Sequence, residues 1–362
     1  MSILMSVILA TVIVVLLLWL ISVVFFKGQD LSAFDHPGEE GAQLSFSRPG
    51  GPSEGHRIAV ITTREFNASL RGQPRKKRLQ MIRDHMDSLG RDIVVSGHVS
   101  AADAGGVPAE WVCAEGSRPD RRILYIHGGA YIAGSPLSHR NITHRFSEIT
   151  GASVLSIDYR LMPENRRKDG ILDCRKAYRW ILQNGPDGPG ATSYLVIAGD
   201  SAGGNLTLSL SAWVRDEKMR LPDAVVALSP SVDGTFSSPS IRRNVKTDIM
   251  LGPLFSILLK VPAWQRRWLY LLESRFRPNN PVVSPIFGDL SGLSPTLIQV
   301  SEAEMLLDDA RRYVNKARAS GTHAVAQSWA DMLHVWHFFY PDVEEAEEAW
   351  REIRSFLQTL PR

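Results

Sequence analysis

The chain has 362 residues, of which 44% are hydrophobic and 22% charged, and its formal net charge is +3. This composition indicates a globular protein with a sizeable core, in one large domain or two ordinary ones. The small charge, with no basic cluster among aromatic residues, excludes a typical nucleic-acid-binding protein. Cys113 and Cys174 lack metal-ligand spacing and form no disulfide framework, so we interpret them as buried free thiols.

The N-terminus begins with an uncharged apolar run over residues 3–26, long enough to cross a bilayer, which takes about 20 residues. A secretory signal would have a basic start, a shorter apolar core and a small-residue cleavage site. No Lys or Arg precedes this run, and Trp19 lies toward its end. We therefore expect residues 1–26 to be an uncleaved, single-pass membrane anchor. Lys27 and Arg48 follow it, and the positive-inside rule then favours a cytoplasmic body.

Residues 27–55 are rich in Gly, Pro and Ser and are interpreted as a linker. Residues 56–106 are expected to form an N-terminal segment of a cap. Within them, PRKKRLQMIRDHMDSLG has apolar residues at helical spacing, which predicts an amphipathic helix. The basic start of this helix is either a solvated face or a contact with anionic lipid.

From residue 107 onward, short β-like runs alternate with helical stretches. The runs are VPAEWVCAE, RILYIHGG, ASVLSIDYR, SYLVIAGD, AVVALSP and TLIQVSE. This alternation predicts an α/β fold with a mainly parallel sheet flanked by helices. The alternation lapses over residues 231–284, a Trp-, Leu- and Pro-rich stretch that we interpret as a helical cap inserted between core segments 107–230 and 285–362.

The most specific motif is VIAGDSAGGN, which contains Gly199-x-Ser201-x-Gly203 between a β-like run and a helical one. A serine in that context lies on a sharp strand-to-helix turn with its hydroxyl exposed, and larger neighbours would prevent the turn. The alternative is a glycine-rich turn without chemistry. We predict that Ser201 is a nucleophile.

A serine nucleophile needs a histidine base that is held by a carboxylate, in the chain order serine, acid, histidine for this type of sheet. Three late histidines are candidates. His323 comes just before the β-like run AVAQSWA and would lie at the wrong end of that strand. His334 and His337 both follow that strand, and their spacing favours His334 only slightly.

The acid is expected in or after the turn that follows the run TLIQVS. Glu302, Glu304, Asp308 and Asp309 qualify by charge. The two aspartates lie in the helix that follows, so we interpret them as a solvated first turn or a cap. Glu302 and Glu304 lie in the turn itself, and the residue pattern does not separate them.

The stretch His127-Gly128-Gly129 ends another β-like run. Acyl transfer builds an oxyanion that backbone N–H groups must hold. We expect the N–H groups of Gly128, Gly129 and Ala202 to do so. His127 is expected to brace the loop through its ring rather than to act as a base.

Five motifs, HGGAY, IDYRLMPEN, GDSAGG, EMLLDD and DMLHVW, occur in that order after residue 107. Together they resemble the hormone-sensitive-lipase family of α/β-hydrolase esterases, in its bacterial form. The resemblance places the family's nucleophile on Ser201, its histidine on His334 and its acid on Glu304. It also implies that Asp158 and Asp200 support the architecture of the site.

The resemblance implies hydrolysis of short- or medium-chain carboxylic esters through an acyl-enzyme, without metal or organic cofactor. A lactone hydrolase or lipid deacetylase at the same site is the alternative, and the anchor suggests lipid-derived substrates. A receptor-like module that binds a small molecule is the alternative from another class, against which the three candidate catalytic residues argue. Nothing in the sequence indicates an oligomeric state.

Two positions and one five-residue stretch depart from the family pattern. Ala130 stands where the third glycine of HGGG is usual, and Glu304 stands where aspartate is more common. The stretch RRKDG, residues 166–170, replaces an apolar, proline-containing segment.

Overall fold

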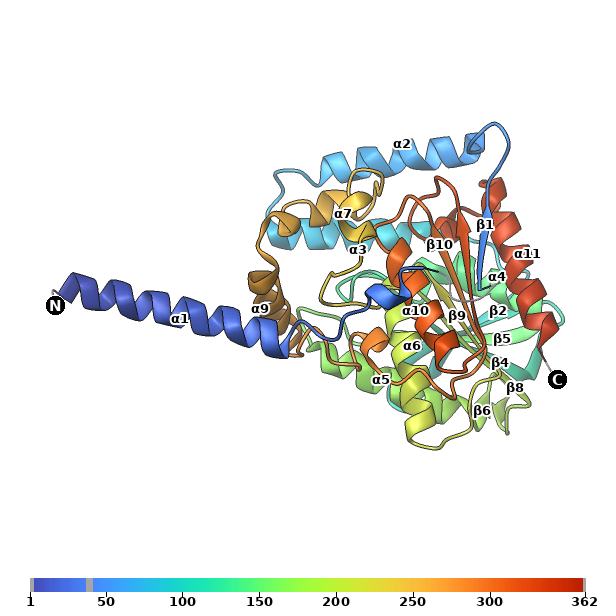
Figure 1. Ribbon diagram of the computed structural model, residues 1–362. Coiled ribbons are helices and arrows are strands. Elements are labelled where there is room, and N and C mark those ends of the chain that lie inside the picture. The colour runs from blue at the N-terminus through green and yellow to red at the C-terminus, as the bar shows by residue number, and fades with distance from the viewer. Residues whose placement is uncertain (1–2, 37–41, 361–362) are drawn as a thin grey trace.

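The computed structural model describes residues 3–36 and 42–360, and its centre is a nine-stranded sheet (Figure 1). The strand order is β1-β11-β10-β9-β8-β4-β5-β3-β2, parallel from β1 through β5 and antiparallel at β3 and β2. The strands are β1 (Gln43–Phe46), β2 (Gly97–Asp103), β3 (Pro108–Ala114), β4 (Arg118–Ile126), β5 (Ala152–Ile157), β8 (Tyr194–Asp200), β9 (Ala224–Leu228), β10 (Thr296–Ser301) and β11 (Ala324–Trp329), with a separate pair β6 (Asn184–Gly185) and β7 (Gly188–Pro189).

Helices cover both faces of this sheet. One face packs against α4 (Arg140–Thr150) and α11 (Glu344–Thr359). The other packs against α5 (Arg167–Ile181), α6 (Ser201–Asp216) and α10 (Leu307–Ala319). The expected α/β-hydrolase arrangement, a mainly parallel sheet between helices, is therefore confirmed.

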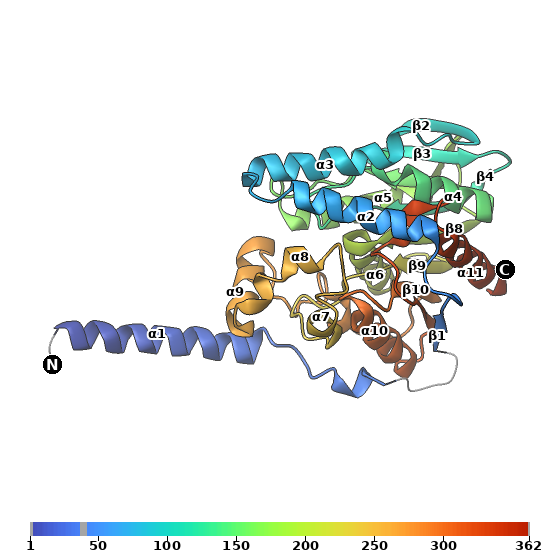
Figure 2. The same cartoon turned by 90° about the horizontal axis from the view of Figure 1, so that it is seen from above.

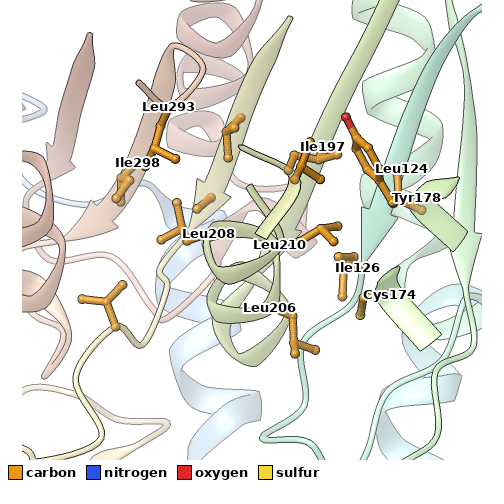
Figure 3. Packing of buried hydrophobic residues seen from close by; sticks show 14 of the residues in the cluster. Leu124, Ile126, Cys174, Tyr178, Ile197, Leu206, Leu208, Leu210, Leu293 and Ile298 are labelled. Atoms are coloured by element: carbon orange, nitrogen blue, oxygen red, sulfur yellow. The ribbon is translucent and has the colours of Figure 1, made fainter. Parts of the chain in front are cut away.

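The core follows from the two-residue period of the strands. In β4, Leu124 and Ile126 belong to the apolar cluster on one face, whereas Ile123 and Tyr125 belong to the cluster on the other. Figure 3 shows the first cluster, in which the strand side chains meet Leu206, Leu208 and Leu210 of α6. Both cysteines are free and buried, as expected from the sequence.

A helical layer, α2 (Glu54–Ser69), α3 (Arg75–Arg91), α7 (Ser240–Arg243), α8 (Gly252–Phe255) and α9 (Ala263–Ser274), lies together at one side of the body (Figure 2). Phe66 of α2 stacks on His85 of α3 with 3.7 Å between ring centroids. Asn67 donates to the carbonyl of Ile249 at 2.9 Å, which ties α2 to the segment between α7 and α8. The layer therefore joins two segments that are far apart in the sequence.

Two strands of the nine-stranded sheet lie in segments where the sequence predicted none. β1 falls inside the expected linker 27–55 and pairs with β11 at the sheet edge. β2 falls inside the expected cap segment 56–106 and pairs with β3. Both are edge strands with little apolar alternation, so their stability comes from main-chain pairing, which composition does not reveal.

The N-terminal helix α1 (Ile3–Phe25) projects away from the body in both views (Figures 1 and 2). It is long and apolar enough to cross a membrane. Its C-terminal end contacts α9: the indole of Trp268 donates to the carbonyl of Leu18 at 3.0 Å, and Ser22 donates to the carbonyl of Trp264 at 3.1 Å. The long helix is thus fixed to the helical layer.

Candidate active site

Ser201 lies on the sharp turn between β8 and α6, with a positive φ of 52° that non-glycine residues rarely adopt. A Cβ added at Gly203 would come within 1.9 Å of the Ile126 carbonyl oxygen, and one at Gly199 within 2.5 Å of the same atom. The two motif glycines are therefore required because β4 passes directly beside the turn.

Three strand ends bring together the side chains that the resemblance selected. His334, in the loop after β11, has its Nε2 at 2.9 Å from the Ser201 hydroxyl. Its Nδ1 lies 2.5 Å from Oε2 of Glu304, in the turn after β10. The serine, imidazole and carboxylate thus form one continuous hydrogen-bonded chain.

The carboxylate of Glu304 is itself held in place. Its Oε1 accepts from the Ser229 hydroxyl at 2.7 Å and from the backbone N–H of Ser301 at 2.8 Å. Since a carboxylate accepts, Nδ1 of His334 carries the proton, and Nε2 is left to accept from Ser201. Burial disfavours the charged ring, but the charge and hydrogen bond of Glu304, together with the charges of Asp248 and Asp200, raise the pKa of His334 above its ordinary value.

The other candidates for the base and the acid have different hydrogen-bond partners or lie elsewhere. Nε2 of His337 lies 2.7 Å from Oε1 of Gln299, and complete burial lowers the pKa of His337 to about 3. Glu302 accepts from the Ser328 hydroxyl at 3.0 Å. His323 is exposed and immediately precedes β11. In this geometry, none of the three contacts Ser201.

Asp308 and Asp309 lie in the first turn of α10, but the prediction of a solvated turn is wrong because both are buried. Asp308 accepts from the N–H of Ser240 at 2.8 Å. Asp309 accepts from the N–H of Val232 at 2.9 Å, and burial with the nearby Asp233 raises its pKa to about 7. These carboxyl groups fasten the segment after β9 onto α10.

The loop after β4 differs from the expectation at one donor. The N–H of Gly128 donates to Oδ1 of Asp200 at 2.9 Å, so this N–H is not available to an oxyanion. The following residues, Gly129 and Ala130, have positive φ angles of 106° and 54°, and Ala130 lines the same cavity as Ser201 and Ala202. Within residues 3–36 and 42–360, the N–H groups of Gly129 and Ala130 donate to no protein acceptor. The first turn of a helix, where Ala202 lies, also leaves N–H groups free.

Sequence reasoning therefore missed Ala130 as a candidate oxyanion donor. The signal was present, because Ala130 occupies the third glycine position of the HGGG pattern, but it was interpreted only as a departure from that pattern.

A cluster of buried polar side chains contacts the loop after β4 and holds it in place. Asp200 also accepts from the Tyr125 hydroxyl at 2.6 Å and lies 3.3 Å from Nε2 of His139. His127 has Nδ1 at 2.8 Å from the Gly128 carbonyl oxygen, and burial lowers the pKa of its ring to about 3, so the ring is neutral. These contacts are consistent with the support expected from Asp200 and with the expected bracing by His127.

The support expected from Asp158 is not seen, because its side chain is exposed. The next residue, Tyr159, makes the contact instead: its hydroxyl donates to the His127 carbonyl at 2.9 Å, and its ring stacks on that of His127 at 4.4 Å. Alternation along the chain after β5 turns Asp158 outward and Tyr159 inward.

A cavity of about 280 Å³ opens beside Ser201, between the strand-end loops and the helical layer. Its wall is mostly apolar and includes Ile241, Leu251, Phe255, Leu258, Leu269 and Met305. In the described part of the chain, no group of His, Cys, Asp and Glu side chains has the arrangement of a metal site.

The fold and the site define an α/β hydrolase. A family model described as alpha/beta hydrolase fold matches residues 123–338, and the chain belongs to this family. It is 34% identical over 291 residues to an acetyl-hydrolase of Streptomyces hygroscopicus, covering 79% of this chain and 90% of that protein. It is also 34% identical over 241 residues to the carboxylesterase/phospholipase LipF of Mycobacterium tuberculosis, covering 66% and 62%.

Solved structures give the same result. A crystal structure of an esterase from the bacterial hormone-sensitive lipase family matches with a TM-score of 0.70 and 31% identity, covering 84% of this chain and 98% of that one. An esterase/lipase from an uncultured bacterium matches with a TM-score of 0.71 and 31% identity, with the same coverage. The protein is a carboxylesterase- or lipase-like hydrolase of ester bonds.

Proposed function

We propose that the protein is a serine ester hydrolase whose catalytic triad is Ser201, His334 and Glu304. The observation that carries this proposal is the unbroken chain from the Ser201 hydroxyl through the imidazole to the Glu304 carboxylate, with contacts of 2.9 and 2.5 Å. An intact triad also argues against a receptor-like module that only binds its ligand.

In the proposed reaction the Ser201 oxygen attacks the ester carbonyl while Nε2 of His334 takes the hydroxyl proton. The resulting oxyanion is held by the N–H groups of Gly129, Ala130 and Ala202. Collapse breaks the carbon–oxygen bond, and the histidine returns its proton to the leaving alcohol. His334 then deprotonates a water molecule as the water attacks the acyl-serine. The histidine returns that proton to the serine oxygen as the acyl–oxygen bond breaks, which releases the carboxylic acid and free serine.

We propose short or medium acyl chains as substrates and the helical layer as the cap that selects them. The cavity of about 280 Å³ has a largely apolar wall, and each buried methylene contributes about 0.8 kcal/mol to binding until that space is filled. A relative named acetyl-hydrolase supports small acyl groups, and deacetylation of a larger molecule is compatible with the same site.

We further propose that α1 is retained as a membrane anchor on a cytoplasmic body. The contacts of Trp268 with Leu18 and of Ser22 with Trp264 make the end of α1 part of the folded structure. The rings of Phe26 and Trp268 also meet edge to face at 4.9 Å. A signal peptide that is removed would have no such role in the mature fold.

The triad is tested with a water-soluble ester and a fluorophosphonate probe. We expect Ser201→Ala to lower kcat by about 10⁴- to 10⁶-fold and to abolish labelling, since the nucleophile is lost while a small side chain still fits the turn. His334→Ala should lower kcat almost as far, whereas the matched change His337→Ala should have a small effect through packing. Near-native turnover in Ser201→Ala, or a reversed order of the histidines, would overturn the assignment.

A further inference from the structure

Arg167, from the atypical stretch RRKDG, is buried in the wall of the catalytic cavity. It is the first residue of α5 and is only 7% exposed. The segment that departs from the family pattern thus places a guanidinium group beside the reaction centre.

Contacts from three elements around the site fix this group. Its Nη1 donates to the Tyr270 hydroxyl of α9 at 2.8 Å, and its Nη2 donates to Oδ1 of Asn205 at 3.1 Å. Asn205 lies one turn after Ser201 on α6. The guanidinium also lies 3.8 Å from the ring centroid of Tyr131, which follows Ala130 in the oxyanion loop.

None of these partners carries a negative charge. Among the ion pairs of residues 3–36 and 42–360, none involves Arg167; its Nη2 also donates to the neutral carbonyl of Val283 at 3.5 Å, and its buried Nε has no acceptor. Arginine stays protonated in proteins, and a buried charge is costly unless it is paired. The cavity wall therefore carries a positive charge without a protein counter-ion.

A second arginine of the same wall has the same property. Arg266 of α9 is 3% exposed, and its Nη1 donates to the carbonyl oxygens of Val261 at 2.7 Å and Leu259 at 3.3 Å. The charged groups that act on it most strongly are Arg242 and Arg267, which are also positive. Among the described residues that line the cavity, the acidic one is Glu273, and its side chain is exposed.

We propose that the cavity binds esters that carry a carboxylate in addition to the ester group, and that Arg167 is the residue that binds it. This inference rests on the proposed esterase function and names its substrate class. An apolar chain would occupy the apolar wall while its terminal carboxylate neutralises the guanidinium, an arrangement for which arginine is well suited. A neutral ester of equal length would leave that charge unpaired.

The test compares monomethyl esters of dicarboxylic acids, from succinate to suberate, with methyl alkanoates of equal chain length, by methanol release. We expect the wild-type protein to prefer the monomethyl esters at one or two chain lengths, with competitive inhibition by the corresponding dicarboxylate. Acetate esters of ω-hydroxy acids, compared with simple alkyl acetates, show whether the carboxylate lies instead on the alcohol side.

Arg167→Met should lower kcat/KM for the preferred carboxylate-bearing ester by about 10- to 100-fold more than kcat/KM for the methyl alkanoate, the loss typical of a charge-assisted hydrogen bond. The matched control is Lys168→Met, which removes an exposed positive charge from the next position and should change neither. Arg167→Lys should retain part of the preference.

Two results would overturn the proposal: a wild-type protein without preference for either carboxylate-bearing series, or an Arg167→Met variant that loses both ester classes equally, as a purely structural residue would. The wild-type preference and the inhibition by dicarboxylates can be measured even if the variant does not fold. Failure to hydrolyse any ester would instead count against the proposed triad.

Discussion

At the scale of single residues, Glu304 is the acid of the proposed triad and stands where the family resemblance places aspartate more often. One of its carboxylate oxygens contacts His334, and the other accepts from Ser229 and Ser301. Both oxygens are therefore positioned, and the side chain is 1% exposed. The additional methylene group does not loosen the contact on which the proposed mechanism depends.

We expect Glu304→Gln to lower kcat by about 10⁴-fold and to shift the acidic limb of the pH–rate profile to lower pH. His334 must be neutral to accept a proton, so kcat/KM falls as the pH drops through its pKa. The carboxylate raises this pKa, and a neutral amide does not. The measurement is kcat/KM against pH on a water-soluble ester. Glu302→Gln is the control and should leave both the rate and the limb unchanged; an unshifted limb in Glu304→Gln would contradict the role of the carboxylate.

Motifs in the sequence were sufficient to select Ser201 as the candidate nucleophile, because a turn this sharp packs closely against the neighbouring strand and needs glycines beside the serine. Spacing could not separate Glu302 from Glu304, because a shift of two residues in a tight turn redirects a side chain without altering the pattern. Only the family resemblance chose between them. Gly128 was assigned wrongly as a donor because the direction of its N–H depends on the Asp200 carboxylate, 72 residues away.

At the scale of the elements, the loop after β4 gives a separate test of the oxyanion donors. We expect Ala130→Val to lower kcat by about 10²- to 10³-fold, the loss typical of one oxyanion-hole donor, because a β-branched residue is strained at a φ of 54° and would displace the N–H. Ala130→Gly is the control and should retain the wild-type rate, since glycine adopts this φ freely. Full activity in Ala130→Val would exclude this N–H as a donor.

The elements that the sequence predicted well are those with strong internal patterns. The strands β4, β5, β8, β9 and β10 each contain a short apolar run because both of their faces are buried, and α3 shows a clear amphipathic period. The edge strands β1 and β2 lack such a pattern. Their place in the sheet is determined by tertiary pairing and could not be predicted from local residues.

At the scale of the whole molecule, the proposed anchor and the catalytic cavity meet at α9. Trp264 and Trp268 of this helix contact α1, whereas Leu269 lines the cavity and is also 47% exposed. Leu272 on the same helix is 59% exposed. If α1 spans the bilayer, its contacts with α9 hold this apolar surface, and the cavity beside it, at the level of the lipid.

Deleting residues 1–26 should therefore affect hydrolysis of a water-soluble ester and hydrolysis of a membrane-embedded ester differently. We expect the shortened protein to be released from the membrane fraction by carbonate and to keep kcat/KM on a water-soluble ester within about twofold, because the triad does not involve α1. Its rate on a medium-chain ester embedded in vesicles should fall by about 10²-fold, since the high effective concentration provided by the anchor is lost.

In the full-length protein, Leu272→Asp should slow hydrolysis of the vesicle ester alone, because a charge opposes contact of α9 with lipid. Leu221→Asp is the matched control: Leu221 is 38% exposed and precedes β9, far from α9 in the chain.

Equal loss of both ester types in the protein without residues 1–26 would mean that α1 supports the fold rather than access to lipid. Unchanged hydrolysis of the vesicle ester would mean that substrate reaches the cavity from water.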